Sequence, residues 1–182
     1  MKIIVPKTLV QIKPGYGPLF FLAGPIQGGD DWQRNCYEEI RKHLPHAYVA
    51  IPYYDNSEMS FPLMSQAIEG TDADGRFEHQ LDWERHYLAL AAKQGCIIFW
   101  LPEESKLKPR TSGAYATDTR GEIGRWSVEL KYNPQYRIVI GAEPKFPSLS
   151  EIHRNFIADQ GFDFQFHSTL TETVAAALKK VS

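Results

Sequence analysis

The chain has 182 residues, a typical length for one domain, and we take residues 1–182 as a single unit. Hydrophobic residues make up 43% of it and charged residues 23%, an ordinary globular composition that excludes a disordered chain, collagen and a coiled coil. Its 20 Lys and Arg residues are scattered and are balanced by 22 Asp and Glu residues, so we expect no nucleic acid polymer as a partner.

The number of cysteines and the hydropathy of the chain bear on the cellular compartment of the protein. The two cysteines, Cys36 and Cys96, are too few for a disulfide framework or a zinc site. We therefore expect two reduced core thiols in a cytoplasmic protein, and no bound metal. No apolar stretch has the length of a membrane span and no cleavage site follows the first one, so we expect neither a membrane partner nor secretion.

Strand-like and helix-like segments alternate along the chain. Apolar runs of strand length occur at residues 19–24, 47–52, 96–102, 137–142 and 162–166. Helical periodicity occurs between them, over about 31–44, 77–94 and 118–131, and again around 170–181. In the first of these helices Trp32, Cys36 and Ile40 recur every four residues, and Asp30 or Asp31 is the expected N-cap.

This alternation predicts an α/β fold, in which a flavodoxin-like or Rossmann-like sheet of five parallel strands has helices on both faces. The apolar run over 96–101 agrees with a strand that is buried on both sides. We expect residues 2–12, interrupted by Pro6, to add an edge hairpin. Ligands bind beyond the carboxyl ends of such strands. Two long irregular stretches begin there, 53–76 and 103–117, and we predict that both border an active site.

Three segments at that edge carry candidate chemistry, and the first covers residues 20–32. Gly24 and Gly28 would let the backbone approach a ligand closely, and the N-terminus of the next helix could face an anion. A tight turn followed by an N-cap explains the same residues, and Asp30 and Asp31 would repel a phosphate. Both interpretations remain open at this point.

The second segment, 78–84, offers Asp82 at the start of the second helix. We place Leu81 on the core face of this helix, so that Asp82 could reach over the sheet edge. Negative charge in a first turn also favours the helix dipole without any function, and we prefer that explanation for Glu78 and Glu84.

The third segment, 117–126, offers Glu122 between two glycines that leave room for a sugar carbon to approach the carboxylate. A purely structural explanation also exists, because Thr119 and Glu122 have the spacing of a capping box. The spacing alone does not decide between the two.

Taken together, the three segments resemble the nucleoside 2-deoxyribosyltransferase-like family, in the expected order and over about two thirds of the chain. The matching stretches are Phe21–Ile26 with Trp32, Asp82–Glu84 leading into Cys96–Pro102, and Arg120–Trp126. The resemblance implies a flavodoxin-like fold and transfer of a 2-deoxyribosyl group between nucleobases, with no cofactor. It also implies a homo-oligomer whose subunits share active sites.

The resemblance also implies roles for individual residues. It makes Glu122 the nucleophile of a double displacement and Asp82 the group that handles the proton of the base. Asp118 lies closer to Glu122 than the family's second aspartate lies to its glutamate. Phe20 and Phe21 occupy the strand in which the family often has a tyrosine. The residues expected to bind the nucleoside or nucleotide are Phe21, Gly24, Pro25, Gly28, Trp83 and Asp118.

Other functions fit parts of the same pattern. An N-glycoside hydrolase acting on nucleosides, their 5′-monophosphates or NAD would use the same carboxylates, with Arg34, Arg120 and Arg125 as candidate cations. A non-catalytic nucleotide-binding protein would keep the fold without turnover. A Rossmann-type oxidoreductase is disfavoured, because the chain lacks the glycine fingerprint.

Overall fold

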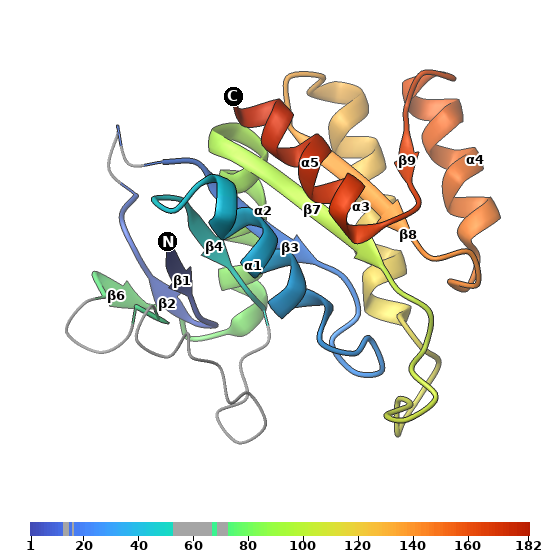
Figure 1. Cartoon of the computed structure of the whole chain (residues 1–182), viewed down its shortest axis with the longest axis horizontal. Helices are drawn as coiled ribbons and strands as arrows, with labels where there is room; N and C mark the ends of the chain where they lie inside the picture. The colour runs from blue at the N-terminus through green and yellow to red at the C-terminus, as the bar shows by residue number, and fades with distance from the viewer. Residues whose placement is uncertain (13–14, 16, 53–66, 69–72) are drawn as a thin grey trace.

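The computed structural model describes residues 1–12, 15, 17–52, 67–68 and 73–182. The described residues form a seven-stranded parallel sheet, five helices and a small two-stranded antiparallel sheet (Figure 1). The strands of the main sheet are β1 (Lys2–Ile4), β3 (Leu19–Ala23), β4 (Tyr48–Ala50), β5 (Ala67–Ile68), β7 (Gly95–Leu101), β8 (Ile138–Ala142) and β9 (Phe166–His167). The helices are α1 (Trp32–His43), α2 (Gln80–Gln94), α3 (Thr117–Tyr132), α4 (Leu149–Gln160) and α5 (Leu170–Val181).

The predicted α/β fold is confirmed. Strands lie in the order β5-β1-β4-β3-β7-β8-β9, and every neighbouring pair is parallel. The five strands expected from the sequence are β3, β4, β7, β8 and β9, and they follow the order 2-1-3-4-5 of flavodoxin-like sheets. All seven residues of β7 are buried, as its unbroken apolar run predicted.

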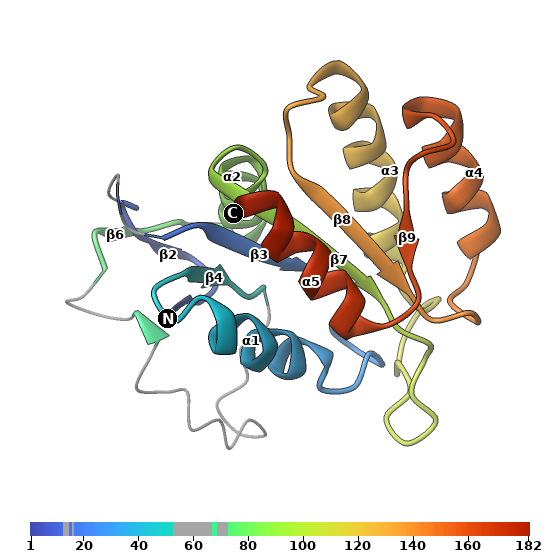
Figure 2. The ribbon, with the colours of Figure 1, turned by 45° about the horizontal axis from the view of Figure 1, so that its top comes forward.

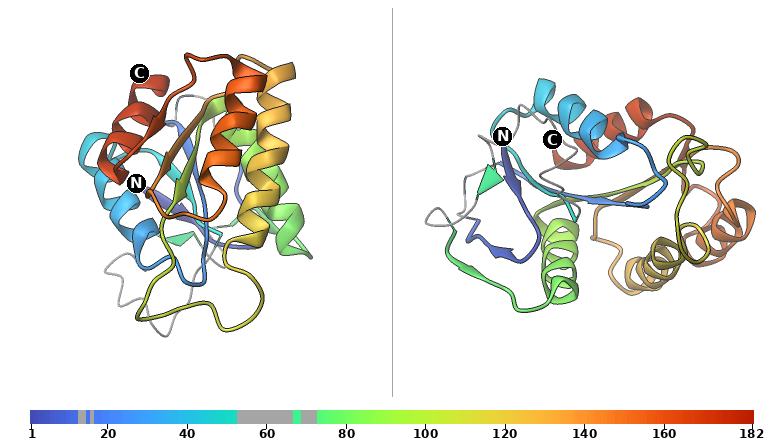
Figure 3. Two further views of the ribbon diagram at one scale, coloured as in Figure 1. Left: turned by 90° about the vertical axis from the view of Figure 1, so that its right-hand side faces the viewer. Right: turned by 90° about the horizontal axis from the view of Figure 1, so that it is seen from below.

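Helices cover both faces of the sheet and give the domain two apolar layers. Helices α1 and α5 lie side by side on one face (Figure 2), where Trp32, Ile40 and Val174 pack against the sheet. Helices α2, α3 and α4 lie on the opposite face (Figure 3, right). Trp83 and Trp126 enter this second layer from α2 and α3.

The expected N-terminal hairpin is wrong. Strand β1 is a parallel strand inside the main sheet, between β4 and β5, and its residues Ile3 and Ile4 are buried. Strand β2 (Thr8–Leu9) instead pairs antiparallel with β6 (Gly75–Arg76), far along the chain. A hairpin would have paired β1 with the next strand in the chain, but the apolar side chains of β1 are buried between β4 and β5 in the main sheet.

Several local expectations also change. Helix α4 was missed, and the expected strand at 162–166 is reduced to β9, which begins at Phe166. Asp31 is the N-cap of α1, but its side chain makes no capping hydrogen bond. The stretch 53–76 contains β5 and β6, while residues 53–66 and 69–72 lie outside the described part. No helix among the described residues is long and apolar enough to cross a membrane.

Candidate functional site

The main candidate site is a cavity of about 760 Å³ at the carboxyl end of β3. The chain leaves β3 in one direction to form β4 and later returns to form β7, β8 and β9 on the other side of β3. The order of strands therefore reverses between β3 and β7, which is where open α/β sheets bind ligands. The loop after β3, the N-terminal halves of α2 and α3, and the loop over 103–116 supply the walls.

Two helix faces form the opposite sides of this cavity. Helix α2 contributes residues at positions 81, 84, 85 and 88, and α3 contributes residues at 118, 121, 122 and 125. Both sets have spacings of three and four residues, so each is one side of a helix. The lining residues are Leu81, Glu84, Arg85 and Leu88 on α2 and Asp118, Gly121, Glu122 and Arg125 on α3.

Glu122 lies on the cavity wall and does not cap its helix. Helix α3 begins at Thr117, with Ala116 in the N-cap position and no side-chain capping bond. Thr119 and Glu122 therefore lie inside the helix, which removes the capping-box explanation. Burial raises the pKa of Glu122 to about 7, and the negative charges of Glu84 and Asp118 contribute while Arg125 opposes the shift. Near neutral pH this carboxyl exists in both protonation states.

Glu84 is the second carboxylate of the cavity, and the sequence interpretation missed it. Burial raises its pKa, the charge of Asp118 adds to this, and a hydrogen bond from Gln80 opposes it. Gln80 Nε2 donates to Glu84 Oε1 at 2.8 Å and also to the Pro52 carbonyl at 3.1 Å. Glu84 is four residues beyond the helix start and outside the first turn, so the helix-dipole explanation given to it above does not apply.

Asp82 and Trp83 do not line the cavity. Asp82 is exposed on α2, in its first turn, so the dipole explanation fits it. Trp83 is fully buried, and its ring lies 5.8 Å from that of Phe21 and 5.3 Å from that of Tyr87. Trp83 and Tyr87 form the core face of α2, whereas Leu81, which was expected there, is 55% exposed at the cavity.

The residues after β3 divide between lining the cavity and shaping it. Phe21, Gly24 and Pro25 all line it. A Cβ on Gly24 would overlap the carbonyl oxygen of Trp100 and would come within 2.8 Å of the Trp32 ring. Glycine is therefore required there by the packing beneath the cavity.

Gly28 lies outside the cavity and holds the long loop in place. It has a φ of 81°, and a Cβ there would meet the ring of Tyr115 at 3.0 Å. Its carbonyl accepts a hydrogen bond from the Ser105 backbone amide at 2.8 Å. Tyr115 donates its own hydroxyl proton to the Pro102 carbonyl at 3.0 Å, away from the cavity lining. Its phenol therefore does not stand in for the tyrosine that the family often has in the strand of Phe20 and Phe21, which is β3 here.

The loop over 103–116, which the sequence predicted to border an active site, borders this cavity. It contributes Arg110 and Ser112, and Arg110 Nη2 lies 4.0 Å from a carboxylate oxygen of the exposed Asp118. Arg110 Nε also donates to the Ser112 carbonyl at 2.6 Å. These contacts link the loop to the start of α3.

Three arginines line the cavity, and only one of them, Arg125, is among the three cations expected from the sequence. Arg85, Arg110 and Arg125 are lining residues, whereas Arg34 and Arg120 are not. Arg120 instead directs its Nη1 towards Ser148 Oγ, 3.5 Å away at the start of α4. With Glu84, Asp118 and Glu122, the cavity wall carries equal numbers of cationic and acidic side chains.

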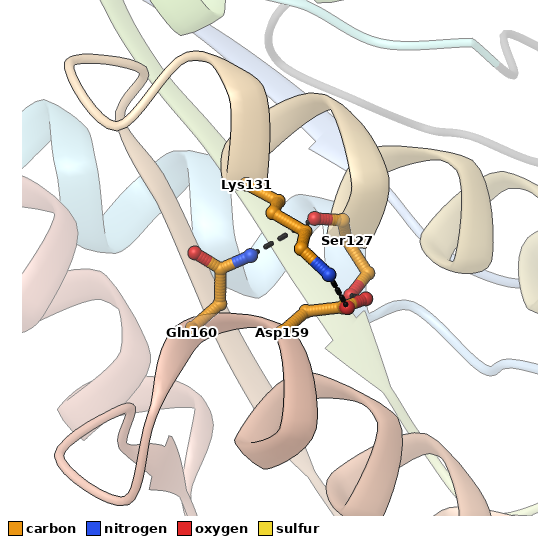
Figure 4. Close-up of polar contacts among 4 residues, drawn as sticks. All are labelled: Ser127, Lys131, Asp159 and Gln160. Atoms are coloured by element: carbon orange, nitrogen blue, oxygen red, sulfur yellow. Dashed lines mark hydrogen bonds and ion pairs between the residues drawn. The ribbon is translucent and has the colours of Figure 1, made fainter.

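Helix α3, which carries Glu122, is fixed to α4 by a polar cluster on its far side (Figure 4). Ser127 Oγ donates to Asp159 Oδ2 at 2.9 Å, and Lys131 Nζ lies 3.0 Å from Asp159 Oδ1. Gln160 Nε2 donates to the Ser127 carbonyl at 2.9 Å. Because these contacts lie about one and a half to two and a half turns beyond Glu122, they hold the helix that presents it.

A second cavity of about 830 Å³ lies between the ends of β8 and β9 and the start of α4. None of the residues predicted from the sequence lines it, and Glu151 is the one carboxylate among its described lining residues. In the described part of the chain, no group of three or more His, Cys, Asp or Glu side chains is placed to hold a metal ion. The paired carboxylates therefore make the first cavity the candidate site.

This cavity can support chemistry in which one carboxyl group is ionised and a neighbouring one is protonated. Burial raises the pKa of both Glu84 and Glu122, and the negative charge of Glu84 adds to the shift of Glu122. A comparison with models of known protein families finds no match for the chain, and a comparison with curated protein sequences finds none either.

Proposed function

We propose that the protein is a nucleoside 2-deoxyribosyltransferase-like enzyme that cleaves the N-glycosidic bond of a deoxynucleoside at Glu122 and transfers the sugar to a second base. The observation that carries this proposal is the position of Glu122, which is on the wall of a cavity large enough for a nucleoside, beside a second carboxylate. The resemblance of the sequence to that family supplies the reaction.

The reaction proceeds by two displacements. The Glu122 carboxylate attacks C1′, the C1′–N bond breaks with its electron pair going to the base, and the base leaves after taking up a proton. A second base then attacks C1′ of the glycosyl-enzyme and releases the Glu122 carboxylate, so that configuration is retained. Gly121 supports this role, because nothing lies within 4 Å of where its Cβ would be, and a sugar can approach the helix there.

Hydrolysis is the second candidate, since water in place of the second base gives free sugar. The three cavity arginines favour a substrate with a phosphate, because guanidinium groups pair with phosphate oxygens. A 5′-monophosphate is therefore the first substrate to compare with the nucleoside. We disfavour a purely nucleotide-binding role, because Glu122 does not serve as a helix cap.

The proposal extends to the assembly and the compartment. We propose a cytoplasmic homo-oligomer in which a neighbouring subunit completes the cavity. Leu81 supports this, because it lines the cavity while 55% exposed, and Tyr132 on α3 is 76% exposed.

Both cysteines are buried and free, as in reducing compartments. Light scattering of the purified protein tests the assembly, and a monomer at assay concentration would contradict it.

The test of activity is chromatography of the protein with 2′-deoxyinosine and an excess of adenine or cytosine. We expect a new deoxynucleoside, whose formation falls at least about a thousandfold in Glu122→Gln and Glu122→Ala. Glu129→Gln, on the same helix and outside the cavity, is the matched control and should keep activity. Free base without a new nucleoside would assign hydrolysis. No turnover of deoxynucleosides, their monophosphates or NAD would refute both.

A further inference from the structure

We propose that Glu84 is the group that gives a proton to the departing base and takes one from the incoming base, in the role that the sequence resemblance assigns to Asp82. This inference rests on the proposed function and adds the second catalytic residue to it. It is carried by the geometry of α2, which presents Glu84 to the cavity and Asp82 to solvent.

The helix repeat separates the two carboxylates. Successive residues are rotated by about 100°, so Asp82 lies roughly 200° around α2 from Glu84 and cannot share its side. Glu84 shares a side with Leu81 and Leu88, which both line the cavity. Trp83 fixes this rotation, because it is fully buried against Phe21 on the sheet. With α2 held in this rotation, Asp82 is exposed and does not line the cavity.

The surroundings of Glu84 suit a proton carrier. Gln80 donates to one carboxylate oxygen, Oε1, and is itself tied to the Pro52 carbonyl at the end of β4. Among the described residues, this is the only hydrogen bond to the Glu84 side chain, and it is made to Oε1. The Gln80 amide thus orients the carboxyl without occupying both oxygens.

Several charges face the pair from both helices and from the loop. Asp118 and Arg125 on α3, Arg85 on α2 and Arg110 on the loop all line the cavity with Glu84 and Glu122. The acidic neighbours favour the protonated form of the pair and the arginines favour the ionised form. The proposed reaction needs one ionised and one protonated carboxyl in the same cavity, and this set of charges allows both forms.

Each bond, electron pair and proton is accounted for in the two proposed displacements. In the first displacement Glu122 forms a bond to C1′, the C1′–N electron pair goes to the base, and Glu84 transfers its proton to a base nitrogen. In the second displacement the incoming base loses a proton to the Glu84 carboxylate as its nitrogen attacks C1′. Glu84 ends protonated and Glu122 ionised, as at the start.

The test compares Glu84→Gln with Asp82→Asn on two substrates. 2′-Deoxyinosine needs a proton on its leaving base, whereas 7-methyl-2′-deoxyguanosine carries a cationic base that leaves as a neutral molecule. We expect Glu84→Gln to lose about a hundredfold or more on deoxyinosine and less than tenfold on the methylated substrate. Its pH profile should also lose the alkaline limb. Asp82→Asn should resemble the wild type in every respect.

The outcomes separate this inference from the proposed function. Equal losses of Glu84→Gln on both substrates, an unchanged pH profile, or the selective loss appearing in Asp82→Asn would overturn the role of Glu84. A glycosyl group trapped on Glu84 in place of Glu122, detected by peptide mass spectrometry, would also overturn it. Turnover that persists in Glu122→Gln would refute the proposed function itself. Circular dichroism of each variant verifies that it is folded.

Discussion

The Glu122 carboxyl makes the stability of the folded protein depend on pH, whatever reaction it performs. Its pKa rises from an ordinary value of 4.5 to about 7 on folding. Between these values the folded state binds more protons than the unfolded state, so the free energy of unfolding falls as the pH rises through that window. The full difference is no more than about 3 kcal/mol, because one pKa unit corresponds to about 1.36 kcal/mol.

The variant Glu122→Gln cannot ionise at this position, so its free energy of unfolding should not fall in this pH window. We expect the variant to unfold at a higher temperature than the wild type at pH 8, and we expect the gain to shrink as the pH is lowered to 5. Thermal and urea unfolding at several pH values measure it. A difference that is constant over this range, or that grows towards pH 5, would show that the carboxyl is not held in the environment described here.

Gly24 allows a second prediction at the scale of one residue. Gly24→Ala would force its methyl group against the Trp100 carbonyl and the Trp32 ring, which belong to β7 and α1. Overpacking against backbone has no cheap relaxation, so we expect a loss of about 3 kcal/mol or more, or a failure to fold. Urea unfolding measures the loss. A variant of near wild-type stability would mean that the loop after β3 can shift.

Residue scale is also where sequence interpretation was least complete. Glu122 could be singled out as a candidate because its glycine neighbours and its place after a buried strand are visible in the sequence, although its spacing also fitted a capping box. Glu84 could not, since the choice between it and Asp82 depends on the rotation of α2 about its axis. The signal was present in Trp83 and Tyr87, aromatic residues four positions apart that form the buried stripe. Because Leu81 was taken as a core residue, the predicted rotation of α2 about its axis was wrong.

At the scale of an element, α3 contains two interior glycines, which lower the stability of the helix and leave open space on its surface. Gly121 and Gly124 both lie in its interior, and a Cβ on either would meet nothing within 4 Å. Glycine inside a helix costs about 0.5–1 kcal/mol relative to alanine. Gly121 lines the candidate cavity, whereas Gly124 lies in a separate groove beside α4.

The two glycines therefore form a matched pair. Gly121→Ala and Gly124→Ala should each raise the free energy of unfolding by about 0.5–1 kcal/mol. In the deoxyribosyl assay only Gly121→Ala should suffer, with kcat/KM reduced about tenfold or more, because its methyl group occupies space next to the nucleophile. Equal activity of the two variants would contradict the placement of the sugar beside Gly121.

Element boundaries show what the sequence can and cannot specify. Helices α1, α2, α3 and α5 were predicted to within a few residues, because each has an apolar stripe and an end signal such as Gly95. Helix α4 was missed although its sequence carries a signal, because Leu149, Ile152 and Phe156 have the i, i+3 and i+7 spacing of an apolar stripe.

At the scale of the whole molecule, the alternation of strands and helices was enough for the fold class and for five strands of the sheet, but it left their order open between flavodoxin-like and Rossmann-like. The two further strands, β1 and β5, join the sheet through parallel pairing with residues distant in sequence. Such pairing is determined by which apolar edge is free for them and not by local spacing. The N-terminal segment was therefore predicted as extended, correctly, but with the wrong partner.

Residues 8–10 of that N-terminal segment are linked to α2 by one buried hydroxyl. Tyr87 Oη accepts a hydrogen bond from the Val10 amide at 2.8 Å and donates to the Thr8 carbonyl at 3.2 Å. Tyr87 lies on α2, one turn after Glu84, so the small β2–β6 sheet and the cavity wall share one helix. Loss of this hydroxyl should loosen the small sheet without disturbing the sheet core.

Tyr87→Phe is the test of this connection. Leaving the Val10 amide and the Thr8 carbonyl unpaired in a buried place should lower the free energy of unfolding by about 1–3 kcal/mol. Hydrogen exchange should accelerate at Val10 and its neighbours in β2, and not in β7. Tyr132→Phe, whose ring is 76% exposed on α3, is the matched control and should stay within about 0.5 kcal/mol of the wild type. Uniformly faster exchange in Tyr87→Phe would mean that the N-terminal segment and the main sheet unfold as one unit.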